Sequence, residues 1–253
     1  STPEQLASIG TDPALPLDGA YVLTADLDLS GYASWTPIGT SAAPFDGTFD
    51  GQGHVISNLT IDDLVAYGGL FGRVSEKGVI KNLGLEQVSI TVTGAAATAC
   101  YVGGIAGWMG DNVRSTAEMR NCYVTGRITA RLSGGDLYLG GLAGKLDADV
   151  SDCFNMASLS GGAGSSTLRS DSLYLGGVAG MIGTYLSDPY VVERCFNEGS
   201  LAPSATQSTA YVGGVVGYLD TRVVFRQCYN TADVWMSPRS YCGRSAYLGG
   251  IAG

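Results

Sequence analysis

The chain is patterned as many short apolar runs separated by glycine, asparagine, aspartate and serine. The runs are rich in residues that favour β-strands, and the separators are typical turn formers. After roughly the first dozen residues, no segment keeps the 3.6-residue apolar period of an amphipathic helix. The pattern therefore predicts an all-β chain built from short strands.

One apolar run recurs at a nearly constant spacing. Its first clear copy reads Tyr101-Val-Gly-Gly-Ile-Ala-Gly107, and a divergent copy occupies residues 66–72. We place the first glycine of each pair at 68, 103, 140, 176, 213 and 249, so successive copies are 35, 37, 36, 37 and 36 residues apart. A repeat of about 36 residues without a helical pattern predicts a β-solenoid with one coil per repeat.

Two further landmarks follow the glycine motif in each repeat. The first is a strand-like run that carries cysteine in four repeats, where the earliest copy carries Leu83: Cys122, Cys153, Cys195 and Cys228. The second is a short closing run, as at residues 126–130. Three strand-like runs per repeat predict a right-handed parallel β-helix with three-strand coils.

Equivalent positions of stacked parallel coils lie above one another, about 4.8 Å apart. We therefore expect the four cysteines to form an inward column of buried single thiols. Asn155, Asn197 and Asn230 should form a second column at a bend, where asparagine tolerates left-handed dihedrals and its amides can bond along the stack. The glycine pair should permit a bulge or a close approach of backbones.

The N-terminus reads differently from the repeats. Thr2 is a candidate helix N-cap, Pro3 suits the first helical position, and Gln5 is the capping-box partner. A short helix that buries Leu6 and Ile9 should cap the solenoid. We divide one continuous domain into residues 1–64, the cap and first coils, and 65–253, the repeats. Because the chain stops inside a glycine motif, we expect it to be part of a longer protein.

Composition and charge exclude several classes of partner. The 253 residues include 38 glycines, and the formal net charge is −9. Nucleic-acid binding needs a basic surface, which this chain lacks. No apolar run reaches the length of a membrane-spanning helix, so we expect no membrane insertion.

At the glycine repeats the sequence resembles bacterial proteins that carry the GLUG motif. Five copies of Gly-Gly-[Ile/Leu/Val]-[Ala/Val]-Gly match its core, and Gly69-Leu-Phe-Gly72 matches more loosely. Segments 26–29, 35–39 and 49–54 look like the leader that precedes such repeats. The resemblance implies an exported or cell-surface protein, often adhesin-like, or the non-catalytic region of secreted IgA-cleaving metallopeptidases. It supplies no catalytic residue, because the zinc motif His-Glu-x-x-His of those peptidases is absent.

One column of the repeat is a candidate ligand surface. If it faces outwards it could bind sugar rings or a peptide, and if it faces inwards it is core. Alternation along the strand leaves the choice open, and we favour a structural role. The column consists of Tyr101, Tyr138, Tyr174, Tyr211 and Tyr247.

Polar clusters offer weaker candidates. His54 follows Asp46 and Asp50 and could be an acid/base or metal group, but the surrounding glycines favour turn residues. Asp147, Asp149 and Asp152 share one loop, and Asp62 and Asp63 share another. Neither loop has a recognised calcium-binding spacing, so we interpret both as solvated acidic loops.

We therefore expect a non-enzymatic structural and interaction module of a secreted or cell-surface protein, with no catalytic residue, metal or cofactor. Its partner would be an unidentified host or cell-surface protein or glycan, and the chain would be a monomer. One alternative is a carbohydrate-binding module. Another is a polysaccharide lyase or glycosidase, which would need clustered carboxylates, or calcium with a basic residue.

Overall fold

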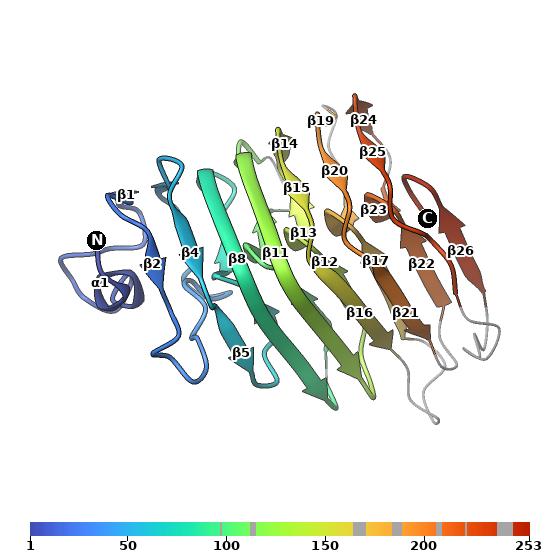
Figure 1. Ribbon diagram of the computed structural model, residues 1–253, viewed down its shortest axis with the longest axis horizontal. Coiled ribbons are helices and arrows are strands. Elements are labelled where there is room, and N and C mark those ends of the chain that lie inside the picture. The colour runs from blue at the N-terminus through green and yellow to red at the C-terminus, as the bar shows by residue number, and fades with distance from the viewer. Residues whose placement is uncertain are drawn as a thin grey trace.

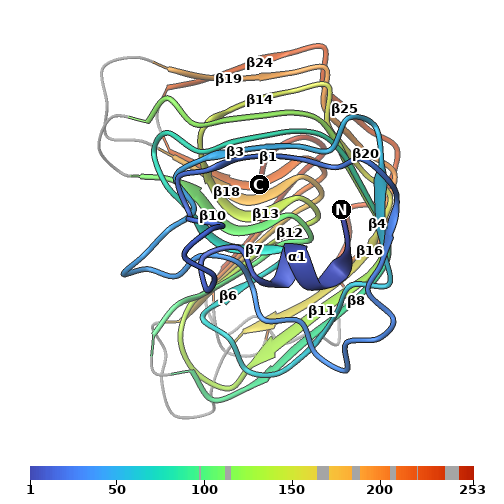
Figure 2. The ribbon, with the colours of Figure 1, turned by 90° about the vertical axis from the view of Figure 1, so that its left-hand side faces the viewer.

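The computed structural model describes residues 1–96, 98–111, 115–163, 171–183, 189–205, 209–220, 222–236 and 245–253. Within them the chain is a stack of coils that runs from the N-terminus at one end to the C-terminus at the other (Figure 1). Every strand pairing is parallel, so the predicted parallel β-helix is confirmed. Seen from the N-terminal end, the chain passes clockwise from β3 through β4 to β6 as it recedes (Figure 2), so the helix is right-handed.

The strands form three sheets. Sheet 1 contains β1 (Ala20–Val22), β2 (Leu27–Asp28), β3 (Thr48–Asp50), β4 (Val55–Ser57), β5 (Thr60–Asp62), β8 (Val79–Gly94), β11 (Glu118–Leu132), β14 (Asp149–Ser151), β15 (Phe154–Asn155), β16 (Ser158–Ala163), β19 (Tyr190–Glu193), β20 (Phe196–Asn197), β21 (Leu201–Ala205), β24 (Val223–Arg226) and β25 (Tyr229–Asn230). Sheet 2 contains β6 (Tyr67–Gly68), β9 (Cys100–Val102), β12 (Leu137–Gly140), β17 (Ser172–Gly176), β22 (Thr209–Gly213) and β26 (Ala246–Gly249). Sheet 3 contains β7 (Phe71–Val74), β10 (Ala106–Gly110), β13 (Ala143–Asp147), β18 (Ala179–Ile182) and β23 (Val216–Leu219).

The three sheets divide the repeat differently from the three runs seen in the sequence. The glycine motif supplies two strands, one in sheet 2 and one in sheet 3, because the chain turns sharply at the glycine pair. The cysteine run and the closing run lie together in sheet 1, and in β8 and β11 they form one continuous strand. The sharp turn needs glycine because a Cβ on Gly176 would come within 2.0 Å of the Ala179 carbonyl oxygen.

The divergent first repeat also differs by one residue from the sequence alignment. In sheet 2, Tyr67 pairs with Tyr101 and Gly68 pairs with Val102. Gly69, rather than Gly68, therefore lies beside Gly103, and a Cβ on Gly69 would approach the Gly103 carbonyl oxygen to 2.8 Å. The corner of this coil is one residue shorter than the corners that follow.

The N-terminal end of the stack is closed by α1 (Pro3–Ala7), which lies across the first coils in Figure 2. The Thr2 hydroxyl accepts a hydrogen bond from the Gln5 backbone N–H, and the Gln5 side chain accepts one from the Thr2 N–H. This is the predicted capping box. Leu6 and Ile9 are 4% and 5% exposed and join the core.

Candidate functional site: the outward ladders of the coils

The tyrosine column lies on the outer face of sheet 2. Its members alternate along their strands with fully buried side chains such as Leu139 and Leu175, which point into the core. Successive rings are parallel, with interplanar angles of 2° to 11° and centroid separations of 4.5 to 5.4 Å. The structure brings together all five tyrosines singled out from the sequence and adds Tyr67 at the N-terminal end.

The stacking occupies the ring faces. Aromatic residues that bind sugars or flat ligands do so through a ring face. In the middle of the column both faces of Tyr138 and of Tyr174 are covered by neighbouring rings, which leaves edges and hydroxyl groups for contact. Burial raises the pKa of Tyr101 to about 12.

The column is half-buried because side chains of sheet 3 pack against it. Trp108 of β10 lies 5.1 Å from the Tyr101 ring, and Tyr218 of β23 meets Tyr174 edge-on at 5.7 Å. The tyrosines thus face outwards from the core but are covered on one side. Alternation alone could not show this, because the covering residues belong to a strand on the far side of the glycine turn.

Two cations sandwich Trp108. The guanidinium carbon of Arg73 lies 3.9 Å from the ring centroid, and the Lys145 ammonium nitrogen lies 4.2 Å from it. These residues occupy neighbouring strands of sheet 3, in register with Trp108. Arg73 also donates hydrogen bonds to the Trp108 and Gly110 carbonyl oxygens, at 3.2 and 2.7 Å.

Asp147 completes this cluster, and its predicted place in a solvated acidic loop is wrong. Its side chain is fully buried, and Oδ2 accepts hydrogen bonds from Trp108 Nε1 at 2.8 Å and Lys145 Nζ at 3.1 Å. Burial raises the pKa of the Asp147 carboxyl, and the Lys145 charge offsets part of that rise. Asp147 is buried because it belongs to the end of β13 rather than to a loop.

The other two acids of this segment are exposed and connect neighbouring coils. Asp149 accepts a hydrogen bond from the Val191 backbone N–H at 2.8 Å. Asp152 pairs with Arg194 through two bonds of 2.6 and 2.8 Å, which lowers the pKa of its carboxyl. Both acids therefore contribute to coil stacking.

A second aromatic ladder runs along sheet 1, and the sequence reasoning missed it. Its rings are 4.8 to 5.0 Å apart with interplanar angles of 3° or 4°. The available signal was the residue after each column cysteine, which is aromatic in every copy. The ladder consists of Tyr123, Phe154, Phe196 and Tyr229.

The cysteines stack in one column, as free thiols. Three are buried and Cys228 is half-buried. Each sulfur donates to the carbonyl oxygen two residues earlier, at 3.1 to 3.3 Å, which requires the protonated thiol. Burial raises the pKa of Cys153. Cys100 is a buried free thiol of sheet 2, and Cys242 lies outside the described residues.

The asparagines form a hydrogen-bonded ladder. Asn155 Nδ2 donates to Asn197 Oδ1, and Asn197 Nδ2 donates to Asn230 Oδ1, both at 2.8 Å. Their backbones do not adopt the expected left-handed conformation. That conformation belongs to the residue before each column cysteine, for example Asp152 with φ 55° and Arg194 with φ 51°.

Asp46, Asp50 and His54 do not converge on one point. His54 Nδ1 lies 3.0 Å from Asp26 Oδ1, and Asp50 Oδ2 lies 3.1 Å from Lys81 Nζ. Asp46 accepts a hydrogen bond from the Ser75 hydroxyl. In the part of the chain that the structure describes, no group of three or more His, Cys, Asp and Glu side chains is arranged to hold a metal ion. The same residues contain no helix with the length and apolarity to cross a membrane.

Comparison with known proteins supports the resemblance seen in the repeats. Residues 98–129 match a family model described as the GLUG motif. The chain is 35% identical over 142 residues to halomucin of Haloquadratum walsbyi, a match that covers 50% of this chain and 1% of halomucin. It is 39% identical over 83 residues to a candidate Gly-rich membrane protein of Evansella cellulosilytica, covering 30% of this chain and 10% of that protein.

A solved structure shares the fold. The crystal structure of a candidate immunoglobulin A1 protease from Bacteroides ovatus aligns with a TM-score of 0.64 at 21% identity, over 98% of this chain and 82% of that one. The chain therefore carries the GLUG motif on a fold already seen in that structure. It corresponds to only a small part of the two long curated relatives.

Proposed function

We propose that this GLUG-motif β-helix is a non-enzymatic structural and interaction module of an exported cell-surface protein, with an adhesin-like role. The observation that carries the proposal is the use of outward side chains for stacking. On sheets 1 and 2, one aromatic ring per coil lies flat against the ring of the next coil. Such a surface suits a rod whose task is to hold its shape.

The ladders explain how a short repeat can form a stiff extended module. Each coil contacts only its neighbours, so stability accumulates coil by coil. A stacked aromatic pair contributes about 0.5–1.5 kcal/mol beyond area burial, and this module has two such ladders. The connections from sheet 3 to sheet 1 differ in length, from the single residue Ala148 between β13 and β14 to residues 111–117 between β10 and β11, so a partner could be recognised by the longer connections presented on a constant frame.

The relatives support a location at the cell surface. One is named a membrane protein, and both are far longer than this chain. A repetitive segment that matches a small fraction of a long protein suits a spacer or a display module. The partner would be a host or cell-surface protein or glycan.

The polar groups support a non-enzymatic role over a glycosidase or lyase. Those enzymes use two acids at a fixed separation, or calcium beside a basic residue. Asp147 is held by Lys145 and Trp108, and Asp152 is held by Arg194. These acids therefore serve packing between coils in our proposal.

The test is a paired assay on the purified chain. Incubation with pectin, alginate and xylan should release no reducing ends above the level of heat-denatured chain. Beads coated with the native chain should be retained on surfaces carrying extracellular-matrix proteins or mucin glycans, above the level of beads carrying denatured chain. Release of reducing ends would overturn the non-enzymatic role. Absence of retention on every surface would overturn the adhesin-like role.

A further inference from the structure

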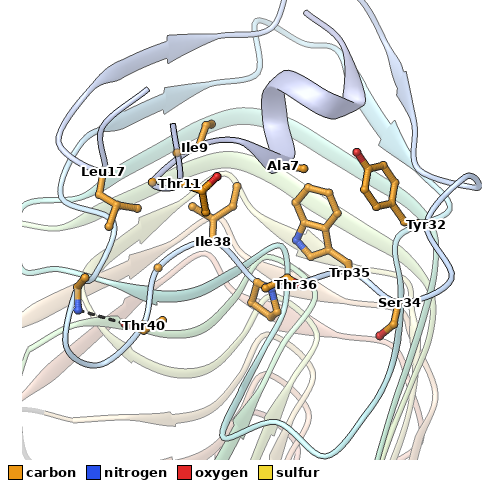
Figure 3. A pocket seen from close by; sticks show the side chains of 14 residues that line it. Ala7, Ile9, Thr11, Leu17, Tyr32, Ser34, Trp35, Thr36, Ile38 and Thr40 are labelled. Atoms are coloured by element: carbon orange, nitrogen blue, oxygen red, sulfur yellow. Dashed lines mark hydrogen bonds between the residues drawn. The ribbon is translucent and has the colours of Figure 1, made fainter. Parts of the chain in front are cut away.

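A ligand surface needs side chains that solvent can reach, and the cavity beside α1 does not provide an apolar one. This cavity of about 390 Å³ is lined by the segment after α1 and the segment before β3 (Figure 3). Its apolar side chains belong to the core, since Ile9, Trp35 and Ile38 are only 3% to 5% exposed. The closing runs of the repeats, on the outer face of sheet 1, present exposed polar side chains instead.

This polar face is built from β8, β11 and β16, which lie side by side in Figure 1. Along β11, the buried Ile128 and Ala130 alternate with Arg127, Thr129 and Arg131, which therefore point outwards. Both arginines are exposed. Because they are four positions apart on one strand, their Cα atoms are separated by about 13 Å.

Hydroxyl groups of the neighbouring strands surround the two arginines. The Ser160 hydroxyl accepts a hydrogen bond from Arg131 Nη2 at 3.3 Å. The hydroxyl residues that flank the arginines in the strand register are Ser89, Thr91 and Thr93 of β8, Thr129 of β11, and Ser158 and Ser160 of β16. We call these residues, together with Arg127 and Arg131, the arginine patch.

The two arginines differ from other basic residues of sheet 1 in their partners. Lys81, Arg120 and Arg226 each pair with an acid, at N–O distances of 3.1, 2.7 and 3.6 Å. Within the described residues, Arg127 and Arg131 form no ion pair with a carboxylate. Their charges are therefore available to a ligand.

The make-up of the patch selects the chemistry of that ligand. Guanidinium groups bind carboxylates through two parallel N–H···O bonds, and hydroxyl groups bind the hydroxyls of a sugar. A protein partner would need an apolar anchor, which the residues of the patch do not supply. A nucleic acid would need contacts to many phosphates, whereas the patch offers two cations on a chain of net charge −9. A glycan that carries carboxylates matches both the arginines and the hydroxyls.

The negative charge of the whole chain does not prevent such binding. An acid on the same face, Asp62 of β5, is two strands away from Thr129. Two strand spacings amount to about 10 Å, which exceeds the screening length of about 8 Å at physiological salt. Repulsion from this acid is therefore largely screened.

We propose that the arginine patch binds a carboxylated glycan, with Arg127 and Arg131 on two carboxylates of one glycan chain and the serine and threonine hydroxyls on its hydroxyl groups. Because one sugar ring does not span about 13 Å, the ligand is an oligosaccharide or a longer chain. The inference rests on the proposed function in treating the chain as an interaction module, and it names the class of ligand.

The test is biolayer interferometry of the whole 253-residue chain on immobilised polygalacturonate oligosaccharides. The matched probe is the methyl ester of the same oligosaccharides, which keeps the sugar chain and removes its charge. The native chain should bind the acid form and not the ester, and its affinity should fall about tenfold between about 50 mM and about 500 mM NaCl. The double variant Arg127→Gln/Arg131→Gln should bind the acid form about tenfold more weakly, because both charge-assisted contacts are lost.

The matched control is Arg120→Gln/Arg226→Gln. It removes the same charge from sheet 1, but from side chains that already have acidic partners, so its binding should equal that of the native chain. Circular dichroism of each variant checks that its fold is retained.

Four results would each overturn the proposed site: no binding of the acid form, equal binding of the ester, an equal loss in both double variants, or undiminished binding by the Arg127/Arg131 variant. Binding of dextran sulfate without binding of polygalacturonate would overturn the assignment to carboxylates. The bead-retention assay on matrix proteins and mucin glycans is scored separately with the native chain. Retention there without polygalacturonate binding would refute this site and leave the proposed function standing.

Discussion

The side chain of Asn197 occupies the space that a β-carbon on Gly177 would need. A Cβ built on Gly177 would lie 2.2 Å from Asn197 Cγ and 2.3 Å from the Gly214 carbonyl oxygen. The same contact joins Gly141 to Asn155 in the preceding coil and Gly214 to Asn230 in the following one. The second glycine of the motif and the asparagine of the cysteine run are therefore two halves of one packing arrangement.

The first prediction concerns this contact. Gly177→Ala should lower the free energy of unfolding by about 3 kcal/mol or more, because both the amide and a backbone carbonyl must shift. The matched control is Gly250→Ala, the same motif position in the last coil, where a Cβ would meet nothing within 4 Å. Urea unfolding measures both. Equal losses for the two variants would show that the close approach does not constrain the fold.

The second prediction concerns the buried ion pair. In the next coil, Met181 stands in the position of Lys145 and Gly183 in the position of Asp147. Both members of the ion pair are therefore missing from that coil. Either Lys145→Met or Asp147→Asn should cost about 3–5 kcal/mol, because each leaves a buried charge without its partner. The double variant should cost clearly less than the sum.

A double-mutant cycle from urea unfolding measures this coupling. A coupling energy near zero would mean that the two charges are stabilised separately, Asp147 by the Trp108 indole N–H and Lys145 by the face of the Trp108 ring. Exposed Arg194 and Asp152 provide a comparison pair, since an exposed ion pair contributes only about 0–1 kcal/mol.

The third prediction is a loss of stability at alkaline pH. The folded-state pKa of Tyr101 is raised from 10 to about 12 by burial, and that of Tyr123 is raised to about 12 by burial and Glu86. Between these pH values the folded chain holds protons that the unfolded chain has released. Stability from these groups is therefore present below pH 10 and falls as pH rises towards 12.

Urea midpoints measured on both sides of this window provide the test. Tyr101→Phe removes one titrating group, so the alkaline fall in its stability should be smaller than that of the native chain. A fall of the same size in both proteins would show that Tyr101 titrates normally when folded.

The repeat and the parallel coil could be predicted because they depend on spacing, which the sequence displays directly. The columns that contain Cys153 and Asn197 could be predicted in the same way, because equivalent residues recur in each repeat. The burial of Asp147 could not be predicted, because its neighbours Trp108 and Lys145 meet it only through the register of sheet 3. The orientation of Tyr138 could not be predicted from its own strand. Its neighbours along that strand, Leu137 and Leu139, are buried, whereas the side chains that cover the tyrosine column belong to sheet 3, beyond the glycine turn.

The central claim is that the tyrosine column stabilises the rod and does not serve as a sugar-binding strip. Tyr174 has a stacked neighbour on each side, whereas Tyr247 stacks on Tyr211 and is 50% exposed. The most direct measurement is the urea unfolding free energy of Tyr174→Ala beside that of Tyr247→Ala. We predict a loss of about 2–3 kcal/mol for Tyr174→Ala and a clearly smaller loss for Tyr247→Ala. Unchanged stability in Tyr174→Ala, together with lost retention on glycan surfaces, would contradict the account and identify the column as a binding surface.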